Sequence, residues 1–102
     1  MRIEHYPIDV LKCEIAAIVG RRLDLTRYRL FFFGSRVSGT STERSDIDVG
    51  IGGPAEIPVE VIGAIREDLE ELPTLYSIDV VDFAAASSDF TSVALQHTES
   101  IT

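Results

Sequence analysis

The sequence has little of what several large classes of protein require. Cys13 is the single cysteine among 102 residues, so an intrachain disulfide and a multi-cysteine zinc site are excluded. The longest apolar stretches, such as Ile15–Val19 and Leu30–Phe33, fall far short of the roughly 20 residues that span a bilayer. The first residues lack the basic head and continuous apolar region of a secretory signal. We therefore expect a cytoplasmic protein with no membrane segment.

Basic residues are also scarce. The chain has 17 Asp and Glu against 9 Lys and Arg, and its formal net charge is −8. A surface of that sign repels phosphate backbones, so a nucleic acid is not expected as the main partner. The one basic concentration consists of Arg21, Arg22, Arg27 and Arg29. We interpret it as a solvated surface, with a partner or RNA contact as the alternative.

The composition is that of a folded chain. Hydrophobic residues make up 45% and charged residues 25%, values typical of globular proteins and not of disordered ones. No repeat, linker or low-complexity tract divides the sequence, and its length suits one folded unit. We predict a single domain over residues 1–102.

Apolar residues that recur every three or four positions predict amphipathic helices over Pro7–Arg22 and Val59–Leu72. A weaker helical segment is predicted over Ser88–His97, with Ser88 as its N-cap. Cys13 lies inside the first apolar pattern, so we expect it to be a small buried hydrophobe.

Three segments have the character of strands. Arg29–Phe33 is short, aromatic and followed by Gly34, which is typical of a strand buried on both faces. Asp46–Ile51 alternates polar and apolar residues with period two, and Leu75–Phe83 is rich in branched and aromatic residues. A loop of small polar residues separates the first two. The order helix, strand, loop, strand, helix, strand, helix predicts an α/β (α+β) fold.

Two aspartates in the second predicted strand share one face. Asp46 and Asp48 are two residues apart, and alternate residues of a strand point the same way. At about 4 Å their repulsion is on the order of 4 kcal/mol with an effective dielectric of about 20. A positive charge is therefore expected beside them. Oxygen ligands on a stiff strand suit Mg²⁺, whose remaining ligands are then water and substrate phosphates.

The residues that follow the first strand suit a phosphate group. Gly34 ends the strand with no side chain in the way, and Ser35 offers a hydroxyl and a backbone N–H. Arg36 and Arg44 flank the loop, and a guanidinium matches phosphate oxygens well. For both arginines the alternative is a salt bridge with a nearby carboxylate, such as that of Glu43.

A third carboxylate would complete a two-metal site. The third predicted strand offers Asp79 and Asp82, and because their numbers differ by three, a regular strand points them to opposite faces. We prefer Asp79, which has apolar neighbours on both sides. Asp82 stands near the end of the strand, where it could equally cap a turn.

These features together resemble the DNA polymerase beta nucleotidyltransferase superfamily. The pattern is Gly34-Ser35, ten intervening residues, Asp46-x-Asp48 and a later aspartate in an apolar strand. The resemblance covers roughly Leu30 to Phe83. The short chain is most similar to the minimal nucleotidyltransferases (MNT) that pair with HEPN-domain proteins in toxin–antitoxin systems. This likeness implies a nucleotidyltransferase fold, with a small mixed β-sheet and helices packed on one side.

The resemblance also implies a reaction and its residues. Asp46 and Asp48 would hold two Mg²⁺ ions that bridge the phosphates of a nucleoside triphosphate, while Gly34, Ser35 and Arg36 would bind the nucleotide. Asp79 would ligate the ion nearer the acceptor and help to deprotonate its hydroxyl. Relatives that act with HEPN partners adenylylate a tyrosine of the partner, which implies ATP as donor and a HEPN-domain protein as acceptor.

Two other interpretations stay open. One is a non-catalytic binding module that neutralises a partner toxin through its acidic surface. The other is a transferase for small molecules, but such relatives carry a further acceptor domain that 102 residues leave no room for. A shallow site of this kind is expected to need a partner, or a second copy of the chain in a homo-oligomer, to supply the missing wall.

Overall fold

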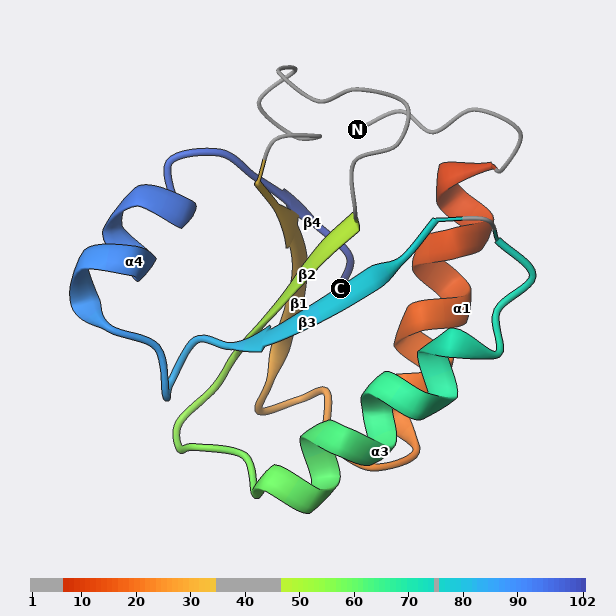
Figure 1. The fold of residues 1–102 in the computed structure, drawn as a ribbon, viewed down its shortest axis with the longest axis horizontal. Helices are drawn as coiled ribbons and strands as arrows, with labels where there is room; N and C mark the ends of the chain where they lie inside the picture. Colours follow the sequence, from red (N-terminus) through yellow and green to blue (C-terminus); the bar gives the residue numbers. More distant parts are fainter. Residues whose placement is uncertain (1–6, 35–46, 75) are drawn as a thin grey trace.

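The computed structural model describes residues 7–34, 47–74 and 76–102. Within these ranges a four-stranded sheet is flanked by helices (Figure 1). The elements in chain order are α1 (Ile8–Gly20), β1 (Arg29–Phe33), β2 (Ile47–Gly52), α3 (Val59–Glu70), β3 (Ile78–Asp82), α4 (Ser88–Ala94) and β4 (Thr98–Ser100). None of the described helices has the length and apolarity that a membrane crossing demands.

The sheet is mixed, as predicted, with strand order β3-β2-β1-β4. β1 pairs antiparallel with both β2 and β4, whereas β2 and β3 run parallel. β1 covers the residues that the sequence predicts. β3 is shorter than predicted, because it begins at Ile78.

β4 was not predicted from the sequence. Its three residues are polar and mostly exposed, so neither apolarity nor alternation marks them as a strand. They become one by pairing with β1, and the backbone N–H of Ile101 then donates to Leu30 O at 2.8 Å. A 2.9 Å ion pair between Lys12 of α1 and Glu99 of β4 ties this edge of the sheet to the first helix.

The core lies between one face of the sheet and the helices α1 and α3 (Figure 1). Alternate residues of the strands point into it, and each fully buried large side chain contributes roughly 1.5–3 kcal/mol relative to an exposed one. The fully buried large residues are Phe32, Leu11, Ile15, Leu30, Ile47, Ile51, Ile65, Leu69, Val19, Val49 and Val80. This packing holds β2 and β3, which carry the aspartates, on a rigid support.

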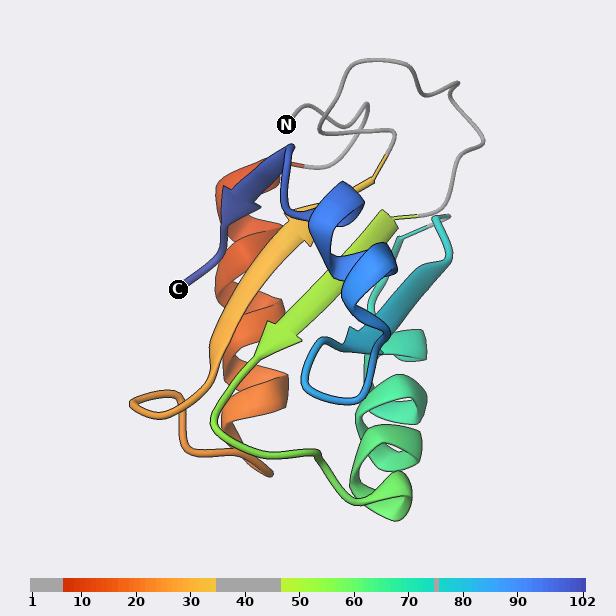
Figure 2. The same cartoon turned by 90° about the vertical axis from the view of Figure 1, so that its left-hand side faces the viewer.

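Among the described residues, only α4 and the segments beside it cover the other face of the sheet, and they cover it in part. Figure 2 shows α4 in front of this face, with α1 behind the sheet. The helices are therefore not all on one side. α4 docks through rings, since Phe90 lies 6.0 Å from Phe33 and 5.7 Å from Phe83, measured between ring centroids. Gly50 of β2 leaves room for this cluster, because a Cβ there would lie 2.7 Å from the ring of Phe83.

Two local expectations were wrong. Cys13 is exposed, because in α1 it lies about 200° around the helix axis from Leu11, which faces the core. The N-cap of α4 is Ser87 and not Ser88. The Ser87 hydroxyl accepts a 3.2 Å hydrogen bond from the backbone N–H of Phe90, which is the usual geometry of such a cap.

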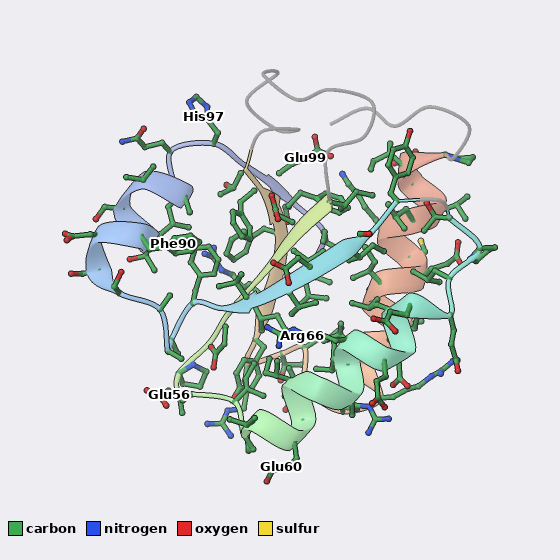
Figure 3. The ribbon with its side chains drawn as sticks, viewed as in Figure 1. Glu56, Glu60, Arg66, Phe90, His97 and Glu99 are labelled. Carbon is green, nitrogen blue, oxygen red and sulfur yellow. The ribbon has the colours of Figure 1, made fainter. Side chains whose placement is uncertain are left out.

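Side chains also connect separate elements. Arg22, just after α1, forms a 2.9 Å ion pair with Asp68 of α3, and this hydrogen bond raises the pKa of the guanidinium. Arg66 of α3 reaches the edge strand β3 (Figure 3), where its Nη2 donates to Val80 O at 2.8 Å. These contacts connect the end of α1 to α3, and α3 to the edge strand β3.

Candidate active site

Asp48 and Asp79 lie side by side on the partly covered face of the sheet. β2 and β3 are parallel, and their register pairs Asp48 with Asp79. Paired residues of neighbouring strands point to the same face about 4.8 Å apart in the backbone. Asp48 is half-buried and Asp79 is exposed. Two carboxylates from strands far apart in the sequence therefore meet at one place.

Gly34 lies directly beside the Asp48 carboxylate. It follows β1 directly and has φ of 87°, in the left-handed region where a side chain is disfavoured. A Cβ built on Gly34 would collide with Oδ2 of Asp48. The glycine thus satisfies two needs at once, since it allows the turn out of β1 and leaves room for the carboxylate.

Asp82 points away from this pair and has a structural task. Its Oδ2 accepts a 2.7 Å hydrogen bond from the backbone N–H of Ile57, and its Oδ1 accepts one of 3.0 Å from that of Ala84. Ile57 belongs to the connection that leads from β2 into α3 and is buried in the core. Asp82 therefore fastens this connection to the end of β3, on the helix side of the sheet.

The orientation of Asp79 is set locally. Its Oδ1 accepts a 3.0 Å hydrogen bond from the backbone N–H of Val80. This contact uses one carboxylate oxygen within β3 and restricts the rotation of the side chain. The geometry suits a ligand that must hold its position in a shallow, solvent-exposed site.

Four of the predicted residues, Ser35, Arg36, Arg44 and Asp46, lie outside the described residues. Within the described parts of the chain, no group of three or more His, Cys, Asp or Glu gathers as a metal site. Asp48 and Asp79 nevertheless fit as two members of an oxygen donor set, since they are neighbours on one face and Gly34 leaves space beside Asp48. Such donors suit Mg²⁺.

Comparison with known families shows to which family the chain belongs. The model of the family described as "Polymerase beta, Nucleotidyltransferase" matches residues 28–102 of this chain. The chain belongs to this family. The resemblance inferred from Gly34-Ser35 and Asp46-x-Asp48 is thereby confirmed, and with it the assignment of the protein to the nucleotidyltransferase enzymes.

One curated relative matches across most of this nucleotidyltransferase. The chain is 29% identical over 85 residues to "Probable protein adenylyltransferase MntA" of Haemophilus influenzae. The match covers 81% of this chain and 75% of the relative.

Solved structures confirm the predicted fold class. A crystal structure described as a toxin–antitoxin with AMP-PNP has a TM-score of 0.73 at 18% identity, covering 89% of this chain and 72% of that one. A complex of a tri-AMPylated Shewanella oneidensis HEPN toxin with its MNT antitoxin has a TM-score of 0.62 at 15% identity. That match covers 92% of this chain and 71% of the other. The chain thus shares the nucleotidyltransferase fold of these proteins.

Proposed function

We propose that this nucleotidyltransferase transfers AMP from ATP to a hydroxyl group of a partner protein, as the cytoplasmic antitoxin of a HEPN/MNT pair. The observation that carries the proposal is the pairing of Asp48 with Asp79 on one face of the sheet, beside Gly34. The relative named as a probable protein adenylyltransferase supports a protein acceptor, and the neighbours with AMP-PNP or an AMPylated HEPN toxin support ATP and a HEPN partner.

In this proposal Asp46, Asp48 and Asp79 hold two Mg²⁺ ions. The ions would neutralise the triphosphate and stabilise the charge that develops during transfer. Ser35 would hold the β- and γ-phosphates and the Arg36 guanidinium would neutralise the triphosphate, while Gly34 would line the nucleotide site. The half-buried position of Asp48 strengthens its attraction for a cation, because fewer water dipoles screen a partly buried carboxylate.

Asp79 is assigned to the acceptor. It is exposed, and β3 is an edge strand, so a partner protein can bring a hydroxyl to it without displacing another strand. Asp79 positions the hydroxyl and helps to remove its proton. The acceptor oxygen then bonds to the α-phosphorus, the bond to the β-phosphate oxygen breaks, and pyrophosphate leaves. The product is an AMP diester of the partner.

The test is label transfer from α-labelled and γ-labelled ATP in the presence of Mg²⁺. The protein is combined with a co-expressed HEPN partner or with lysate of its source cells. We expect a protein band labelled only from the α-position, because pyrophosphate carries the other two phosphates away. Label from the γ-position would instead indicate a kinase and contradict the proposal.

The binding module remains the second candidate, and the net charge of −8 favours it, because it suits a basic partner. The same experiment separates the two. If no label appears with a partner that co-purifies and whose toxicity is nevertheless suppressed, the complex itself neutralises the partner and the transferase proposal fails.

The distinct positions of Asp79 and Asp82 give a second test. Asp79→Asn is expected to lower transfer more than 100-fold, since it weakens a ligand of the acceptor-side ion. Asp82→Ala is expected to lower the free energy of unfolding by about 1–3 kcal/mol, because two backbone N–H groups lose their acceptor.

Thermal melting and transfer below the melting temperature measure both variants. We expect Asp82→Ala to retain most of its transfer activity and Asp79→Asn to retain most of its stability. If Asp82→Ala is inactive while fully folded, the assignment of Asp79 as the third carboxylate is wrong.

A further inference from the structure

A groove of about 290 Å³ lies between the end of β1 and α4, on the same face of the sheet as Asp48. Phe33, Gly34, Phe90 and Val93 line it, together with Gln96 just after the helix. The rings of Phe33 and Phe90 are nearly perpendicular, with 88° between their planes. Figure 3 shows Phe90 on the side of α4 that is turned to the sheet.

The groove adjoins the candidate active site through Gly34. This residue lines the groove, and its Cα also lies against the Asp48 carboxylate, where a Cβ would collide with Oδ2. A molecule seated in the groove therefore ends beside the carboxylate that is assigned to the nucleotide phosphates. The groove and the carboxylates form one continuous surface.

The strand order decides which substrate the groove serves. In the sheet, β2 with Asp48 lies between β3, which carries Asp79, and β1, which leads to the groove. The proposed mechanism places the acceptor at Asp79, on the β3 side. The groove lies on the opposite side of Asp48 and so faces the donor nucleotide.

The chemistry of the groove suits a nucleobase. Its lining is largely apolar and contains the phenyl rings of Phe33 and Phe90 beside the imidazole of His97, and Phe90 and Val93 of α4 are 41% and 69% exposed. Bases stack on aromatic side chains with a contribution of about 1–3 kcal/mol each. The Gln96 amide oxygen can accept a hydrogen bond from N6–H of adenine while its NH₂ group donates to N7, whereas guanine presents two acceptors, O6 and N7, on the same edge.

We propose that this groove binds the base of the donor nucleotide, with Phe90 as its stacking surface and Gln96 as the residue that selects adenine. The inference deepens the proposed function and rests on it. The two residues to which it gives new roles, Phe90 and Gln96, lie outside the sequence motif, in the segment that follows Asp79.

The test compares the affinities of the full chain for ATP, GTP and inorganic tripolyphosphate, each with Mg²⁺, by calorimetry. Phe90→Leu keeps an apolar side chain against the sheet but removes the aromatic surface, so ATP is expected to bind about tenfold more weakly. Tripolyphosphate has no base, and its affinity is expected to stay within twofold of the wild-type value.

Phe83→Leu is the matched control. Phe83 belongs to the same ring cluster, with centroid distances of 4.9 Å to Phe31 and 5.1 Å to Phe33, but it does not line the groove. Because leucine keeps an apolar contact with Phe90, we expect α4 to stay docked and Phe83→Leu to bind ATP like the wild type. If both leucine variants weaken ATP equally, the rings act only through packing and the proposal is overturned.

Gln96→Ala tests selectivity on an exposed side chain. The ratio of ATP to GTP affinity is expected to fall about tenfold, because the alanine no longer distinguishes the two purines. An unchanged ratio overturns the role of Gln96. If the wild type binds ATP and tripolyphosphate equally well, no base site exists and the groove proposal fails while the transferase proposal stands. If it binds neither, both proposals fail.

Discussion

Asp48→Asn is expected to reduce nucleotidyl transfer by about 10³-fold, equivalent to roughly 4 kcal/mol in activation free energy. Asparagine keeps the shape of the side chain but lacks the negative charge that holds a divalent cation, and cation binding supplies several kcal/mol to such transfers. β2 lies between β1 and β3 in the sheet, so the backbone pairing of the variant is expected to stay intact. Label transfer from α-labelled ATP measures the effect.

Asp9→Asn is the matched control for this experiment. Asp9 is exposed in the first turn of α1, and the same loss of one charge there is expected to leave the transfer rate within twofold of the wild type. Circular dichroism of both variants shows whether the fold persists. Full activity of a folded Asp48→Asn protein would remove Asp48 from the site.

Gly34→Ala is expected to damage both stability and activity. A residue with a side chain at φ of 87° costs about 1–2 kcal/mol. The new Cβ also needs the space of Asp48 Oδ2, so the carboxylate or the end of β1 must move. We expect the free energy of unfolding to fall by about 1–3 kcal/mol. Transfer should fall at least tenfold, because a displacement of about 1 Å at a reacting centre is enough for such a loss.

Gly63→Ala is the matched control, and there the same substitution is expected to raise the stability instead of lowering it. Gly63 lies in the middle of α3, and a Cβ there meets nothing within 4 Å. Alanine is the better helix former by about 1 kcal/mol, so this variant is expected to be more stable than the wild type and equally active. Denaturant titration and label transfer on both alanine variants complete the comparison. Wild-type activity in Gly34→Ala would show that Asp48 does not need its present position.

The sequence was most informative where local pattern and tertiary contact agree. The aromatic segment Arg29–Phe33 forms β1 at the predicted bounds, because it is buried almost throughout. The alternation of strand residues also separates Asp79 from Asp82 correctly, since the structure places them on opposite faces. Alternation alone does not predict which strand lies beside β3. The neighbour of Asp79 became known only from the parallel register of β2 and β3.

The C-terminal part was less predictable because it depends on distant contacts. β4 has no pattern of its own and exists through its pairing with β1. The position of α4 over the second face of the sheet depends on Phe90, whose ring contacts come from Phe83 nearby in the chain and from Phe33, which is far away in the sequence. The groove that we assign to the nucleobase arises from this docking, so no sequence motif predicts it.

The edge of β3 has a further consequence for how the molecule meets others. An edge strand normally offers a row of unpaired N–H and C=O groups to which another chain can add a strand, and this is a common route to aggregation. At Val80, the middle residue of β3, the backbone N–H and C=O are instead already hydrogen-bonded to side chains. Its N–H donates to the Asp79 carboxylate and its C=O accepts from Arg66. Two side chains therefore occupy the backbone groups that an added strand would need at this point of β3, which makes strand addition there less favourable.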